Sequence, residues 1–149
     1  SMKPFLVLLL PFVLLGCGAE PPASQAEAVA AIEKLGGTVI LDKTSGEVVG
    51  VSLIDTPITD AGLVHLKGMT SLTTLDLLGT QVTDAGLVHL QGLTSLRELG
   101  LSGPQITDAG LEHLKGLASL TWLDLSNTPI TGAGLAEIKA ALPKCRIHR

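Results

Sequence analysis

Three histidines stand at one fixed spacing, and imidazole nitrogens are common metal ligands. His65, His89 and His113 follow one another every 24 residues, and Glu137 holds the equivalent place in the next copy. Ligands of one metal ion must converge, whereas residues one copy apart lie in a line. We therefore interpret the histidines as a repeated, half-buried polar position, and we expect neither a metal nor another cofactor.

Two aspartates raise the question of general acid–base catalysis by paired carboxylates. Asp76 and Asp124 each lie between two leucines of an alternating apolar segment, and Gly100 holds the equivalent place between them. If these segments are neighbouring strands, the aspartates lie two strand spacings apart, or about 10 Å. We expect no Ser, Cys or His nucleophile beside them in register, and the chain has no glycine-rich phosphate loop. The sequence thus predicts that the protein is not an enzyme.

Residues 1–16 have the pattern of a secretory signal peptide. Lys3 precedes an apolar run from Phe5 to Leu15, and Gly16 follows it. A basic start, a short apolar core and a small residue at the cleavage point are typical of such peptides. The run is shorter than the roughly 20 residues of a membrane-spanning helix. These residues are therefore predicted to be removed on export.

The segment Leu14-Leu15-Gly16-Cys17 resembles the lipobox of bacterial lipoproteins. The resemblance implies cleavage before Cys17 and lipidation of that cysteine. Two alternatives stay open, an ordinary signal peptide with an incidental cysteine and an uncleaved N-terminal anchor. Residues 17–24 are rich in Pro and Ala and are predicted to form a linker that tethers the domain.

Composition restricts the class of protein. The chain has 149 residues, of which 46% are hydrophobic and 2% aromatic, and its formal net charge is -4. It is too apolar for a disordered chain, and its acidic balance argues against nucleic-acid binding. Two of its three aromatic residues, Phe5 and Phe12, lie in the predicted signal peptide. Trp122 is then the one ring left to anchor a binding site.

Most of the remaining chain repeats with a period of 24 residues. Copies start at Val48, Leu72, Leu96 and Leu120. Each begins with an apolar-x-x-apolar-x-apolar pattern, whose alternation is typical of a strand with one buried face. Identical strands joined by connections of this length predict a parallel sheet with right-handed crossovers.

Each copy continues into a Thr-Asp-Ala-Gly-Leu segment that looks like the start of a helix. Asp60, Asp84 and Asp108 are predicted to be N-caps that accept hydrogen bonds from free backbone amides. Gly132 replaces the aspartate in the fourth copy.

A hydroxyl recurs at the ninth position of the copies. Thr56, Thr80 and Thr128 stand there, and we expect their hydroxyls to bond to loop backbone. Pro104 holds this position in the third copy and has neither a hydroxyl nor an N–H. A kink or a looser loop is therefore predicted at that copy.

The repeated positions resemble the leucine-rich repeat family, in the short bacterial form with a Thr-Asp-Ala-Gly-Leu helix start. The resemblance implies an α/β fold, a right-handed solenoid with a parallel β-sheet on the concave face and short helices on the convex face. Residues 48–142 would hold four repeats of 24 residues. The resemblance also implies a binding module whose concave sheet is the binding surface, although a fold alone does not name a partner.

Both ends of an open solenoid need a cover. Residues 25–47 are predicted to be the N-terminal cap, with a helix over 25–35 that has Ser24 as its N-cap, followed by a hairpin. Residues 143–149 are predicted to be a C-terminal cap strand, because Ile147 falls in register with Leu123. We therefore expect the repeat array to be complete.

The repeat also predicts which side chains share the concave face. Positions between the buried leucines project away from the core. Trp122 would point outward there, either as a binding hot spot or covered by Arg146 in a cation–π contact. The candidate binding residues are Ile54, Asp76, Leu78, Glu98, Trp122, Asp124 and Arg146.

These features predict a leucine-rich repeat module that is anchored to the membrane through Cys17 and mediates protein–protein interaction at the bacterial cell envelope. Recognition of a cell-wall or surface glycan is one alternative, and a structural spacer without a specific ligand is another. The expected partner is a protein and not a nucleic acid, and the expected state is a monomer. The lipid anchor would place the module on the periplasmic or the cell-surface side.

Overall fold

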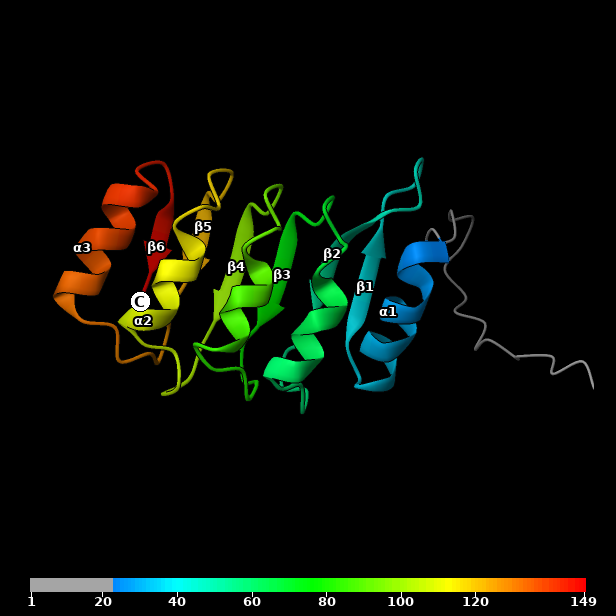
Figure 1. Ribbon diagram of the computed structural model, residues 1–149, viewed down its shortest axis with the longest axis horizontal. Coiled ribbons are helices and arrows are strands. Elements are labelled where there is room, and N and C mark those ends of the chain that lie inside the picture. The colour runs from blue at the N-terminus through cyan, green and yellow to red at the C-terminus, as the bar shows by residue number, and fades with distance from the viewer. Residues whose placement is uncertain (1–22) are drawn as a thin grey trace, which may run out of the picture.

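The computed structural model describes residues 23–149 of the chain. The predicted signal peptide, Cys17 and most of the predicted linker lie outside these described residues. The described part consists of one sheet and a layer of short helices (Figure 1). None of these helices is long and apolar enough to cross a membrane.

Six strands form the sheet, and they lie side by side in the order of the sequence. The strands are β1 Thr38–Leu41, β2 Val48–Ser52, β3 Thr74–Leu77, β4 Glu98–Leu101, β5 Trp122–Asp124 and β6 Arg146–His148. β1 pairs antiparallel with β2, and every later pair is parallel. Each repeated unit returns the chain to the same end of the sheet, so successive strands pair in register. The predicted α/β fold of parallel strands and short helices is therefore confirmed.

The helices lie over one face of the sheet (Figure 1). They are α1 Ala23–Lys34, the 3-10 helix η1 Asp60–Leu66, the 3-10 helix η2 Gly86–Leu90, α2 Asp108–Leu111, the 3-10 helix η3 Glu112–Leu114 and α3 Gly132–Ala141. Most are only one or two turns long, a length at which 3-10 geometry is common. We use the term open face for the sheet surface opposite these helices.

The core lies between the sheet and the helices. Leu75, Leu99 and Leu123 occupy one row of it and are at most 1% exposed. On the helix side, Leu66 and Leu90 are fully buried as well. Within a row, each leucine stacks on the equivalent leucine of the next unit. The units therefore bury their apolar faces together and not singly.

The N-terminal cap differs in detail from the prediction. Helix α1 begins at Ala23, so Ser24 lies in the first turn and is not its N-cap, and the predicted linker ends earlier than residue 24. Gln25 is only 7% exposed, and its Oε1 accepts a hydrogen bond from the Val48 amide at 3.0 Å. The cap is therefore tied to the first repeat strand by a buried polar contact.

The predicted N-cap role of the repeated aspartates is wrong. Asp84 accepts hydrogen bonds from the amide of Thr107, at 2.7 Å, and from its hydroxyl, at 2.5 Å. The Thr107 hydroxyl in turn accepts from the Ala109 amide, so threonine caps the helix start of its own unit. The aspartate instead links two units, because residues 23 apart in a solenoid are direct neighbours. Asp60 and Asp108 repeat this contact with the threonines of their following units.

The glycine of the same motif is explained by this link. A Cβ on Gly110 would lie 2.3 Å from Asp84 Oδ1, and one on Gly134 would lie 2.2 Å from Asp108 Oδ1. No side chain fits so close to a carboxylate oxygen. We call the repeated contact of aspartate with the threonine and glycine of the next unit the Asp–Thr–Gly ladder. Gly132, in place of the fourth aspartate, ends this ladder.

The expected threonine contacts are confirmed. The hydroxyls of Thr56 and Thr80 each donate to the backbone carbonyl three residues earlier at 2.8 Å, and that of Thr128 does so at 2.6 Å. In the third unit Pro104 is exposed, and the preceding Gly103 has a φ of 117°. The residues that precede the three threonines have φ between 54° and 70°. The turn at Pro104 therefore differs from the others in the backbone conformation of Gly103.

Candidate functional site

Two columns of side chains run across the open face, and strand register defines both. The first column contains Gly50, Thr74, Glu98, Trp122 and Arg146. The second contains Ser52, Asp76, Gly100, Asp124 and His148. Alternation along each strand places these residues opposite the buried leucines.

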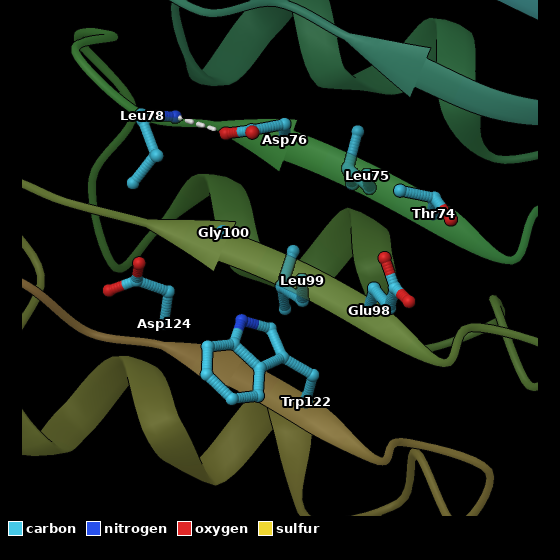
Figure 2. A pocket seen from close by; sticks show the side chains of 9 residues that line it. All are labelled: Thr74, Leu75, Asp76, Leu78, Glu98, Leu99, Gly100, Trp122 and Asp124. Carbon is cyan, nitrogen blue, oxygen red and sulfur yellow. Dashed lines mark hydrogen bonds between the residues drawn. The ribbon is translucent and has the colours of Figure 1, made fainter. Parts of the chain in front are cut away.

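A shallow hollow of about 120 Å³ lies at the centre of the open face (Figure 2). It forms at Gly100, the one glycine of the second column, because β4 carries no side chain at this point. Its lining residues are Thr74, Leu75, Asp76, Leu78, Glu98, Leu99, Gly100, Trp122 and Asp124. Buried leucines lie beneath it, so its base is set by the rigid core.

Two carboxylates flank this hollow and are held in place by backbone. Asp76 Oδ1 accepts a hydrogen bond from the Leu78 amide at 3.1 Å. Asp124 Oδ1 accepts from the Ser126 amide at 2.9 Å and from the Ser126 hydroxyl at 2.5 Å. Such contacts to the residue two positions on are typical of Asx-turns. The two side chains are therefore oriented by the chain itself.

Trp122 closes the hollow on the β5 side. Its indole is 38% exposed, and Figure 2 shows it reaching from β5 towards Gly100 on β4. The ring stacks on His148, with 6.1 Å between ring centroids and 12° between the planes. Among the described residues no cation–π contact joins Trp122 to Arg146. The ring instead stacks on His148, which lies two residues after Arg146 on β6.

Comparison with protein families agrees with this geometry. A family described as Leucine rich repeat matches residues 70–130. That segment covers β3, β4 and β5 together with the connections between them.

The fold is a leucine-rich repeat solenoid.

Two solved structures similar to the solenoid are internalins of Listeria monocytogenes. One internalin has 24% sequence identity over 58% of this chain, with a TM-score of 0.42, and this chain covers 30% of its length. Internalin C2 has 21% identity over 87% of this chain, with a TM-score of 0.45, and is covered to 80%. At such identities and scores, neither protein indicates what this chain binds. No curated protein matches the sequence.

The solenoid brings five of the seven candidate binding residues together at the hollow. These five are Asp76, Leu78, Glu98, Trp122 and Asp124. Ile54 is 47% exposed after β2, and Arg146 lies on β6 beside Trp122, but neither lines the hollow.

Two features of the site were missed from the sequence. The column containing Gly100 was predicted, but the hollow that a missing side chain leaves in it was not. The stacking of His148 on Trp122 was missed because register gives the directly opposite residue, whereas aromatic rings also reach diagonal neighbours. A glycine flanked by aspartates in one column is the signal that would have located the hollow.

The register also corrects one expectation about catalysis. His148 lies directly opposite Asp124, so a histidine does stand beside one of the aspartates. Within residues 23–149 no hydrogen bond joins His148 to an aspartate or a serine. The pair thus lacks the nucleophile–base contact that a catalytic triad requires.

The histidine column lies on the helix side of the solenoid. His65 is exposed, whereas His89 and His113 are half-buried, and His113 Nδ1 lies 2.9 Å from Gln91 Nε2. The described part of the chain contains no group of three or more His, Cys, Asp or Glu side chains that could hold a metal ion.

Proposed function

We propose that this solenoid is a binding module whose open face binds a protein partner, with the hollow at Gly100 as the centre of the interface. The observation that carries the proposal is the position of Trp122, which is 38% exposed and lines the hollow at Gly100 on the open face. Tryptophans in such positions supply a large share of binding energy in protein interfaces.

The surroundings of Trp122 support this proposal. Leu78 and the indole supply apolar surface, while Asp76, Asp124 and Glu98 surround it with charge. An apolar centre with a polar rim is the usual anatomy of a protein–protein interface. A glycan site usually presents aromatic rings as a platform, and the open face offers one indole with a stacked imidazole.

The proposed interface can be tested with two paired variants of the purified domain. Trp122→Ala with Asp124→Ala removes the indole and one carboxylate from the open face. Val88→Ala with Glu137→Ala is the matched control, because it removes an exposed apolar and an exposed acidic side chain from the helix side. We expect the first pair to lose capture of a stoichiometric protein partner from envelope extracts, and the control to keep it.

Other outcomes decide against the proposal. Capture that survives the Trp122/Asp124 variant places the interface elsewhere. Binding to a glycan array that is lost in the same variant favours carbohydrate as the ligand.

We also propose that the module is exported and held at the cell envelope by a lipid on Cys17. The support is in the sequence, where a signal-peptide pattern ends in a lipobox-like segment directly before Cys17. The Cys17→Ser variant is expected to leave the membrane fraction in cell fractionation, with Cys145→Ser as the matched control that stays. Retention of Cys17→Ser in the membrane would show that the lipid is not the anchor.

A further inference from the structure

The acidic side chains of the hollow have no cationic partner in the described part of the chain. The ion pairs found among residues 23–149 join Lys115 to Glu112 and to Glu137, all on the helix side. Asp76, Asp124 and Glu98 therefore present their charge to whatever enters the hollow.

The two aspartates are oriented before any ligand arrives. In each, Oδ1 is held by the backbone amide two residues on, at 3.1 Å for Asp76 and 2.9 Å for Asp124. No hydrogen bond within the described residues is made to the second oxygen of either carboxylate. Carboxylates fixed in this way bind a cation with less loss of side-chain entropy.

The Asp76 carboxylate reaches over Gly100 at the edge of the hollow, because glycine has no Cβ to keep it away. A Cβ on Gly100 would lie 2.8 Å from Asp76 Oδ1 and 3.4 Å from Leu78 Cγ. The site therefore combines two fixed negative groups with apolar contact from Leu78 and the indole of Trp122.

These features favour one type of side chain over others. A guanidinium group is planar, remains charged, donates several parallel hydrogen bonds to carboxylates and packs against aromatic rings. A lysine ammonium is a more strongly hydrated point charge and gains less from a flat apolar wall.

We propose that the hollow at Gly100 binds an arginine side chain of the protein partner, with its guanidinium between Asp76 and Asp124 and against Trp122. This rests on the proposed function, because it names the chemistry that the open face recognises in its partner.

The inference can be tested without knowing the partner. The probe is the blocked tripeptide acetyl-Ala-Arg-Ala-amide, titrated at low ionic strength because salt screens exposed charges. Trp122 is the single tryptophan of the chain, so its fluorescence reports on this hollow alone. The neutral comparison is the same peptide with citrulline, which keeps the shape of arginine without its charge. We expect the arginine peptide to shift Trp122 emission, and the citrulline peptide to bind at least about tenfold more weakly.

Variants locate the contact. Asp76→Asn and Asp124→Asn each remove one charge with little change of shape, and each is expected to weaken the arginine peptide about fivefold to tenfold. Gly100→Ala should weaken the binding as well, because its Cβ would lie 2.8 Å from Asp76 Oδ1 and would displace that carboxylate. Glu27→Gln on α1 is the matched control and should leave binding unchanged. The amide NMR shift of residue 100 gives a second readout that does not depend on the indole.

The outcomes separate this inference from the proposed function. Equal binding of the citrulline peptide, or no response to the arginine peptide in either readout, overturns the arginine site. If either result occurs while Trp122→Ala with Asp124→Ala still abolishes partner capture, the proposed function stands without the arginine site. Saturable arginine binding that is lost in the Asp76 and Asp124 variants supports it.

Discussion

Thr131 donates hydrogen bonds from its hydroxyl and its amide to Asp108, and these bonds lower the pKa of that carboxyl below its ordinary value of 3.8. Hydrogen bonds donated to a carboxylate favour its charged form. A carboxyl whose folded pKa is lowered stabilises the fold above its unfolded pKa, and this stability is lost as the pH falls through the folded pKa. The pKa of Asp42 is lowered in the same direction by bonds from Thr44 and Ser45.

We therefore expect acid to destabilise the solenoid, in part through Asp108. Asp108→Asn should be less stable than the unmodified protein at neutral pH and should lose less stability when the pH falls below 3.8. Urea unfolding on both sides of that pH measures the difference. Glu27→Gln is the control, and an Asp108→Asn variant with the full acid sensitivity would contradict the expectation.

The packing of Asp108 against Gly134 predicts that Gly134→Ala lowers stability when Asp108 is present and raises it when Asp108 is replaced by alanine. Gly134→Ala should cost about 1–3 kcal/mol in the unmodified protein, because its Cβ would lie 2.2 Å from Asp108 Oδ1. In an Asp108→Ala background the clash is gone, and alanine in helix α3 should gain up to about 1 kcal/mol over glycine. Denaturant unfolding of the four proteins in this double-mutant cycle measures the coupling. Equal effects of Gly134→Ala in both backgrounds would refute it.

At the scale of the elements, the buried bond between Gln25 and Val48 fixes α1 to β2. Gln25→Leu should destabilise the domain by about 1–3 kcal/mol, because the Val48 amide keeps no acceptor in its place. The loss is measured by thermal or urea unfolding. Glu27→Gln on the same helix is expected to change little, and an equally stable Gln25→Leu variant would show that water replaces the side chain.

The strands and helices were largely predictable from the sequence, because every copy of the repeat carries the same pattern of apolar and polar residues. The strand rows around Leu75, Leu99 and Leu123 follow from alternation, and their pairing follows from the constant period. Contacts between units were harder to predict, because a residue has neighbours about 24 positions away as well as along its own chain. The carboxylate of Asp84 was assigned to its own helix for this reason, although it bonds to Thr107 of the next unit.

At the scale of the whole molecule, every unit depends on its neighbours for burial. β6 covers β5, and Ile147 packs against the core as the last member of the leucine row. In an array coupled in this way, the loss of a terminal unit weakens the units next to it.

Removal of residues 143–149 is therefore expected to lower the unfolding midpoint of the whole domain while leaving one cooperative transition. Circular dichroism during urea unfolding measures the midpoint. Ile147→Ala is a milder variant that should cost about 1 kcal/mol if the deletion does not fold. Lys144→Ala, an exposed change nearby, is the control. An unchanged midpoint in both the deletion and Ile147→Ala would mean that β6 does not stabilise the array.

The Asp–Thr–Gly ladder has a consequence for how such a chain can lengthen. The second and third units each carry an aspartate for the unit that follows, together with the threonine and glycine that receive the aspartate of the unit before. A tandem duplication of 24 residues within the ladder therefore inserts a module whose two joints already fit. Addition after Gly132 would first need that glycine changed to aspartate, so growth by duplication is favoured in the interior of the array and opposed at its C-terminal end.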